Sequence, residues 1–207
     1  MIITDLKPTK KHLVCISLSN GESLLLDSDL CAEKCLHTGD EMTAEKIKEY
    51  TAESDYIRAK SRALWLLDRY QYSERRLMEK LMSAGFGRQA SEHAVNRLKE
   101  LQVISDEALA CRFAEECARR SISKREAYQK LRLKGFSSDT VNSALENARF
   151  DECSQITSLL EKKYKAKLLS GETDKVYAAL IRKGFSYQSV RECMKKYSEE
   201  LEFSGDI

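Results

Sequence analysis

One pattern of hydrophobic and polar positions occurs three times in this chain. In each copy an apolar or small residue is followed four positions later by Leu, and four positions after that by a Gly-Phe pair. The copies read LMEKLMSAGF at 77–86, AYQKLRLKGF at 127–136 and VYAALIRKGF at 176–185. Their glycines are 50 and 49 positions apart. A fixed period of this length indicates a repeat architecture.

The pattern predicts a helix that ends at the Gly of each copy. A spacing of four places the apolar side chains on one helical face. The Gly can take the left-handed conformation that closes a last turn, and the Phe can then fold back on the apolar face. Residues suited to cap the helix precede each copy. They are Ser73 in the first, Ser123 in the second, and Thr173 or Asp174 in the third.

Apolar positions at helical spacing also precede and follow each copy, so each unit is expected to contain three helices. One unit buries little, whereas stacked units share a continuous core. The sequence therefore predicts a mainly α fold with three tandem three-helix repeats in an elongated array. The expected repeats span residues 56–104, 105–150 and 151–207.

Residues 1–55 carry a different signal. Asn20-Gly21 lies between two apolar runs, which is a strong indication of a β-hairpin with strands near 12–18 and 23–27. Thr43 is placed to cap a short helix. We expect this segment to form a hairpin plus a short helix, joined to the first repeat by a helical bridge at 51–60.

Composition indicates the cellular compartment of the protein and whether it binds a metal. No apolar stretch approaches the roughly 18–20 residues that a membrane span needs, and the first residues lack the apolar core of a signal peptide, so a cytoplasmic protein is expected. The seven cysteines include no CxxC pair and suit small buried side chains in a reducing compartment. Cys31, Cys35 and His37 could be proposed as metal ligands, but a second ligand pair is missing. We expect no metal and no cofactor.

Charge is distributed unevenly along the chain. Residues 1–55 have a net charge of −5, residues 56–135 of +8 and residues 136–207 of −1. The basic residues of the first two repeats cluster around the recurring helix. Such a field favours a polyanionic partner. The alternative is a solvated surface balanced by neighbouring Glu side chains.

No motif indicates catalysis. The three His residues lie in unrelated contexts, and the chain contains no phosphate-binding Gly loop, no paired-carboxylate signature and no nucleophile elbow. The interpretation is that the protein is not an enzyme. Trp65, the single tryptophan, is flanked on its helix by Leu64 and Leu67, and we expect it at the junction with the N-terminal segment.

Three runs in order resemble the RecX family of regulatory proteins. They are SRALWLLDRYQYSERRLMEKLMSAGF at 61–86, LKELQVISDEALACRFAEE at 98–116 and SISKREAYQKLRLKGFSSDTVNSAL at 121–145. The family shows an opening of the form AL..L..R..S..EL..KL...GF, then L.E...I.DE..A..F, then R....L..KGF. The resemblance covers about residues 58–200, and the N-terminal hairpin is similar to an extension that some members carry.

The resemblance implies a function. RecX proteins are tandem three-helix repeats that bind the filament of the recombinase RecA on DNA, suppress its ATPase and strand-exchange activities, promote its disassembly, and are not enzymes. It therefore implies a regulator of recombination, DNA repair and the SOS response, with RecA as partner and weak nonspecific DNA contact. Only the basic positions of the matched helices are carried over as site residues: Arg75, Arg76, Lys80, Arg125, Arg132 and Lys134.

The chain departs from the family pattern in three places. Arg119-Arg120-Ser121-Ile122 lacks the Gly that usually follows the basic residues, Gly87-Arg88-Gln89 replaces a Ser/Glu-type helix start, and the third repeat is nearly neutral. These departures bear on the residue-level contacts more than on the overall function. Two other functions also stay open. One is a helix-turn-helix-like DNA-binding module that acts without RecA. The other is a helical scaffold for a different protein. In each case a monomer is expected.

Overall fold

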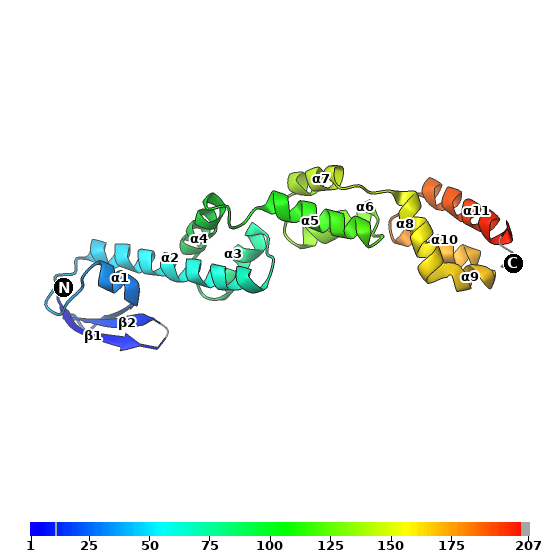
Figure 1. Cartoon of the computed structure of the whole chain (residues 1–207). Helices are drawn as coiled ribbons and strands as arrows, with labels where there is room; N and C mark the ends of the chain where they lie inside the picture. The colour runs from blue at the N-terminus through cyan, green and yellow to red at the C-terminus, as the bar shows by residue number, and fades with distance from the viewer. Residues whose placement is uncertain (11, 204–207) are drawn as a thin grey trace. The chain divides into compact units, whose positions relative to one another are not determined.

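The chain is mainly helical, with a small antiparallel sheet at its N-terminus (Figure 1). The computed structural model describes residues 1–10 and 12–203. It divides into two compact units, Met1–Ile104 and Ser105–Ile207, which are described separately below. The predicted fold class is thus confirmed at this level. The elongated array of tandem repeats and the four predicted segments stay predictions.

The first unit opens with a three-stranded sheet. Strands β1 (Ile3–Thr9), β2 (Leu13–Leu18) and β3 (Ser23–Asp27) pair antiparallel in the order β1-β2-β3. The predicted hairpin is β2-β3, and its turn contains Asn20 and Gly21, where the glycine has a φ of 86°. β1 pairs along the other edge of β2 and gives the hairpin the additional strand that an isolated hairpin needs for stability.

A long helix joins the sheet to the rest of the first unit. After the short α1 (Ser28–Glu33), α2 runs from Ala44 to Arg69, so the predicted short helix and the predicted helical bridge form one element. Thr43 caps α2, as predicted, by accepting a hydrogen bond from the backbone N–H of Lys46 at 3.3 Å. The predicted boundary between residues 55 and 56 falls within α2.

The two halves of α2 serve different cores. Its first half packs on the sheet, and its second half packs on α3 (Glu74–Ser83) and α4 (Arg88–Glu100), as Figure 1 shows. Small side chains at Ala59 and Ala63 are fully buried and let the helices approach closely. The residues of α2, α3 and α4 that share this second core form what we call the first helix group.

The second unit contains two further helix groups. In the second group α5 (Asp106–Arg119), α6 (Lys124–Leu133) and α7 (Ser138–Asn147) enclose one core around the buried Phe136. The third group encloses another core. It consists of α8 (Glu152–Leu159), the π-helical turn η1 (Leu160–Tyr164), α9 (Lys165–Leu169), α10 (Thr173–Arg182) and α11 (Tyr187–Phe203).

The recurring Gly-Phe pair ends a helix in each group, as predicted. Gly85, Gly135 and Gly184 have φ angles of 93°, 96° and 89°. In each case the N–H of the following Phe donates to the carbonyl of the recurring Leu, five positions earlier. This is the Schellman arrangement that satisfies the last carbonyls of a helix.

The predicted N-caps are confirmed in two of the three recurring helices. Ser73 accepts a hydrogen bond from the N–H of Arg76, and Ser123 accepts one from the N–H of Glu126. The prediction for the third helix is wrong. Its N-cap is Glu172 rather than Thr173 or Asp174, and the Glu172 side chain makes no capping hydrogen bond.

Candidate functional site

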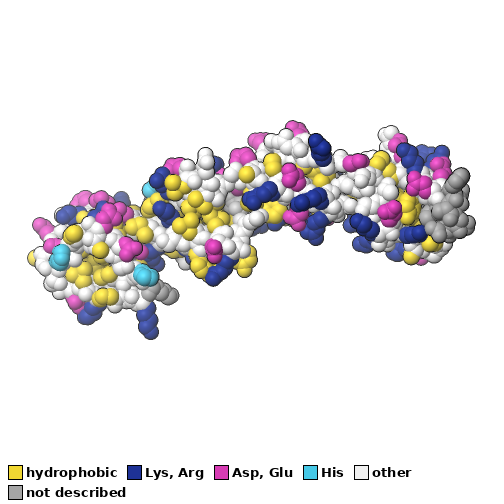
Figure 2. All heavy atoms as spheres, in the orientation of Figure 1, with side chains coloured by type: hydrophobic (Ala, Val, Ile, Leu, Met, Phe, Trp, Pro, Cys, Tyr) yellow, Lys and Arg dark blue, Asp and Glu magenta, His cyan; other side chains and the backbone are white. Residues whose placement is uncertain are grey.

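The basic residues that the sequence singles out lie on two helices, α3 in the first unit and α6 in the second. Figure 2 shows Lys and Arg side chains on the visible face of both units, interspersed with Asp and Glu side chains. How strongly a surface patch attracts an anion therefore depends on which of its Lys and Arg side chains already pair with a carboxylate.

The cations of α3 are partly neutralised within their own helix. Arg75 Nε lies 3.0 Å from Glu79 Oε1, and Arg76 Nη1 lies 2.7 Å from Glu79 Oε2. The two arginines, Arg75 first, hold the pKa of the Glu79 carboxyl below its ordinary value. Lys80 is exposed on the same helix. One carboxylate thus faces two guanidinium groups, which weakens the attraction of α3 for an external anion.

The cations at the C-terminal end of α6 take part in local structure. Arg132 Nη1 donates a hydrogen bond of 2.5 Å to the backbone carbonyl of Phe136, just beyond the helix end. The ammonium nitrogen of Lys134 lies 4.0 Å from the ring centroid of Phe113. Both side chains are exposed, yet each also holds the end of α6 in place. Replacing either one would disturb the fold as well as the surface charge.

Arg125 lies in a different setting, at the start of α6. There the cap residue Ser123 donates its hydroxyl hydrogen to the carbonyl of Lys183, at an oxygen–oxygen distance of 2.5 Å. The start of α6 therefore meets the end of α10. A Cβ placed on Gly184 would lie 3.1 Å from Arg125 Cβ, so the two helix ends are in close contact.

This contact gathers four cations, Lys124 and Arg125 from α6 and Arg182 and Lys183 from the end of α10, which we call the cationic junction. A hollow of about 610 Å³ has Arg125, Arg182 and Lys183 in its lining together with Glu126, and an adjacent hollow of about 490 Å³ has Lys124 and Arg125 together with Glu146 and Glu152. None of the four forms an ion pair with another residue in the described part of the chain.

The helix dipole makes the two α6 cations costly for folding. Lys124 and Arg125 occupy the first turn of α6, where the backbone carries a partial positive charge and cations are unfavourable by roughly 0.3–1 kcal/mol each. Lys183, at the C-cap of α10, lies where a cation is favoured. A side chain that lowers the stability of its own helix, with no partner that offsets the loss, is a candidate for a functional role.

Of the six predicted site residues, only Arg125 belongs to the cationic junction. Lys124, Arg182 and Lys183 also belong to the bases that cluster around the recurring helix in the sequence, but they are not among the six site residues, and the sequence does not show that α6 and α10 meet. The sequence feature that points to this site is the pair of adjacent bases, Lys124 and Arg125, directly after the predicted N-cap Ser123. The predicted residues on α3 lie in the first unit and those on α6 in the second.

Curated proteins similar to this chain share one name. The chain is 29% identical over 197 residues to the regulatory protein RecX of Caldanaerobacter subterraneus subsp. tengcongensis, which covers 94% of this chain and 98% of the relative. It is 26% identical over 199 residues to the protein of the same name from Clostridium tetani, covering 93% and 91%. A third, from Clostridioides difficile, is 27% identical over 202 residues. The resemblance to the RecX family is confirmed.

Solved structures support the fold assignment. A crystal structure of regulatory protein RecX superposes with a TM-score of 0.69 over 94% of this chain and 98% of that one, at 20% identity. RecX from Lactobacillus salivarius gives a TM-score of 0.62 over 70% of this chain and 97% of that one, at 18% identity. No family model matches the chain. The RecX relatives are thus similar to the sheet-containing first unit as well as to the second unit.

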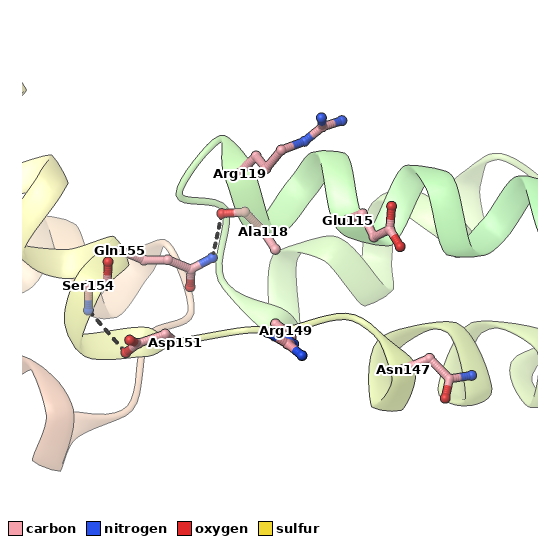
Figure 3. Close-up of a pocket in the computed structure, with 8 residues that line it drawn as sticks. All are labelled: Glu115, Ala118, Arg119, Asn147, Arg149, Asp151, Ser154 and Gln155. Carbon is pink, nitrogen blue, oxygen red and sulfur yellow. Dashed lines mark hydrogen bonds between the residues drawn. The ribbon is translucent and has the colours of Figure 1, made fainter.

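A further hollow of about 430 Å³ lies in the second unit, where α5, the α7–α8 connection and α8 approach one another (Figure 3). The buried Gln155 donates from Nε2 to the carbonyls of Ala118, at 2.9 Å, and Ile122, at 3.3 Å. Arg119 and Arg149 line it together with Glu115 and Asp151, so its charges are mixed. The 610 Å³ hollow of the cationic junction, with Arg125, Arg182 and Lys183 against Glu126 in its lining, is the stronger candidate for a polyanion.

Other chemistry has little support in the part of the chain that the structure describes. No group of three or more His, Cys, Asp or Glu side chains there could hold a metal ion. Cys31 and Cys193 are buried, whereas Cys35 and Cys153 are exposed, and all are free thiols. None of the described helices is both long and apolar enough to cross a bilayer.

Proposed function

We propose that this chain is a non-catalytic regulator that binds the RecA–DNA filament and inhibits its ATPase and strand-exchange activities. The observation that carries the proposal is the alignment, over more than nine tenths of the chain, with proteins named regulatory protein RecX. A role in homologous recombination, DNA repair and the SOS response follows from this partner, as does a cytoplasmic location. We propose a monomer whose three helix groups act as tandem repeats in an elongated array.

The cationic junction is the proposed point of contact with the filament. Lys and Arg side chains that reach phosphate groups release condensed counterions, which gives affinity that falls steeply with salt and carries no sequence information. Lys124, Arg125, Arg182 and Lys183 form no ion pair with another described residue, although Arg182 Nε donates a hydrogen bond to the carbonyl of Ala178 at 3.3 Å. The basic residues of α3 and of the end of α6 are proposed to contribute less, because they already have intramolecular partners.

An ATPase titration tests the proposal. RecA from a bacterium that encodes a close relative of this chain is assembled on single-stranded DNA with ATP, and the full chain is added at increasing ratios. We expect hydrolysis to fall at fewer than one copy of the chain per RecA subunit, because one bound regulator affects several subunits of a continuous filament. Unchanged hydrolysis at stoichiometric amounts would contradict the proposal.

A helix-turn-helix-like module that binds DNA without RecA is the second candidate. The observation that favours it is the size of the helix groups, since three short helices around one core also form such modules. The two functions differ on naked DNA. Sequence-specific binding to a duplex in the absence of RecA would favour the module, and weak binding without sequence preference favours the regulator.

A further inference from the structure

The second half of α2 exposes an unusual group of side chains. Trp65 is 45% exposed and does not belong to the core that α2 forms with α3 and α4. The guanidinium carbons of Arg62 and Arg69 lie 4.2 Å and 4.0 Å from its ring centroid. We call these three residues the tryptophan–arginine cluster.

The spacing of the cluster follows from helix geometry. Arg62, Trp65 and Arg69 are three and four positions apart, so they lie along one face of α2 and the two guanidinium groups reach the indole from opposite directions along the helix. Neither arginine forms an ion pair with another residue described by the structure. Both guanidinium groups lie against the aromatic ring.

The surroundings of the cluster are largely apolar. Figure 2 shows hydrophobic side chains gathered over the α2–α4 part of the visible face. Exposed residues of this part include Leu64, and Tyr70 at the C-cap of α2, which is 58% exposed and whose ring centroid is 5.8 Å from that of Tyr72. The exposed acid at this end of α2 is Asp68.

We propose that the tryptophan–arginine cluster is a stacking site for single-stranded nucleic acid, with a base on the Trp65–guanidinium platform and phosphates on Arg62 and Arg69. Aromatic side chains interleaved with cations are the combination by which proteins hold single strands, because bases stack on rings and on guanidinium planes while phosphates require positive charge. A duplex keeps its bases stacked inside and cannot use the ring.

This inference deepens the proposed function, because it names the strand and the residues that would touch it on the first unit. It does not depend on the cationic junction, which lies in the second unit. An acidic or apolar protein segment is the other occupant that such a face could take, and the test below distinguishes it from a nucleic acid.

The single tryptophan of the chain serves as the reporter. Emission of the full-length protein is recorded during titration with a short oligothymidylate, with an abasic strand of equal length and with a duplex of equal length. We expect oligothymidylate to quench the emission strongly, and the abasic strand and the duplex to quench it weakly. Equal quenching by the abasic strand would overturn the proposal, since phosphates alone would then account for it.

Affinity of variants for a labelled oligothymidylate provides the second readout. Trp65→Leu keeps an apolar side chain and is expected to weaken binding roughly 5- to 150-fold, the range measured when a stacking side chain is removed. Tyr187→Leu is the matched control, because Tyr187 is 65% exposed and has no stacked arginine. We expect Arg62→Gln with Arg69→Gln to reduce the salt dependence as well as the affinity.

The remaining outcomes are equally decisive. Wild-type affinity in Trp65→Leu would overturn the stacking site. If Trp65→Leu loses inhibition of RecA while keeping its affinity for oligothymidylate, the cluster contacts protein, and the proposal is wrong although the proposed function stands. If RecA is not inhibited by the wild type but the strand still quenches Trp65, the proposed function fails and the stacking site stands.

Discussion

At the residue scale, Gly85 and Gly184 have nearly the same backbone but different surroundings. Both end a recurring helix with a left-handed φ, 93° and 89°. A Cβ on Gly85 would meet nothing within 4 Å, whereas one on Gly184 would lie 2.9 Å from Ser123 Oγ and 3.1 Å from Arg125 Cβ. A Gly→Ala substitution therefore strains the backbone at both sites, and at Gly184 the added methyl group also collides with the start of α6.

We expect Gly85→Ala to lower the free energy of unfolding by about 1–2 kcal/mol, the cost of a left-handed Ala. Gly184→Ala should lower it by a further 1–3 kcal/mol or so, since the methyl group displaces the start of α6. Chemical denaturation followed by circular dichroism measures both. Equal losses would show that α6 and the end of α10 are not in contact in solution.

The thiol of Cys193 gives a second test at this scale. Burial, with a further contribution from the hydrogen bond to Cys153, raises the pKa of Cys193 from 9.0 to about 12. Because the folded value exceeds the unfolded one, the stability linked to this group is fully present below about pH 9 and is lost as the pH rises toward 12.

We expect a thiol reagent near pH 8 to modify the exposed Cys35 and to leave Cys193 unmodified until the chain unfolds. Mass spectrometry of peptides taken at intervals follows each site. Cys35 serves as the internal control for reagent activity. Modification of both cysteines at the same rate in the folded chain would contradict the packing of the third helix group.

At the element scale, the start of α6 shows how one side chain serves two helices. Ser123 Oγ accepts from the N–H of Glu126, which caps α6, and donates to the carbonyl of Lys183, which lies at the end of α10. Ser137 occupies an exposed position and caps α7 by accepting a hydrogen bond from the N–H of Thr140. Its hydrogen bonds in the described part of the chain reach no second helix.

Ser123→Ala should therefore destabilise the chain more than Ser137→Ala. Loss of a cap costs about 1 kcal/mol, which is the whole effect expected at Ser137. At Ser123 we expect about 2–3 kcal/mol, because the bond to the Lys183 carbonyl is lost as well. Thermal unfolding of the two variants against wild type measures the difference. A Ser123→Ala effect no larger than that of Ser137→Ala would argue against the second bond.

Most elements were predictable because their signals are local. The hairpin turn at Asn20-Gly21, the caps at Ser73 and Ser123 and the glycine helix ends each depend on a few adjacent residues. The π-helical turn at Leu160–Tyr164 and the uncapped start of α10 were not predicted. Both depend on packing in the third core, where Leu160 and Tyr164 are buried, and no short sequence pattern records that packing.

At the scale of the whole molecule, the candidate site was predictable only in part. Charge counted along the sequence located the basic region and Arg125. It gave no sign that Glu79 pairs with both Arg75 and Arg76, or that Arg182 lies beside the start of α6, because both depend on side-chain geometry in the folded chain. The site residues predicted from the sequence therefore remain a proposal.

The central claim is that the free cations of the junction, more than the paired cations of α3, engage the nucleoprotein filament. Three variants remove two positive charges each: Lys124→Ala with Arg125→Ala, Arg75→Ala with Arg76→Ala, and Lys46→Ala with Lys48→Ala as a control on α2. Each is first shown to unfold like wild type, so that a lost effect reports on binding.

The deciding measurement is the concentration of each variant that halves DNA-dependent ATP hydrolysis by RecA. We predict an increase of about tenfold or more for the junction variant, in line with the loss of two phosphate contacts, a smaller increase for the α3 variant and none for the control. Wild-type inhibition by the junction variant, or a larger loss from the α3 variant, would contradict the account.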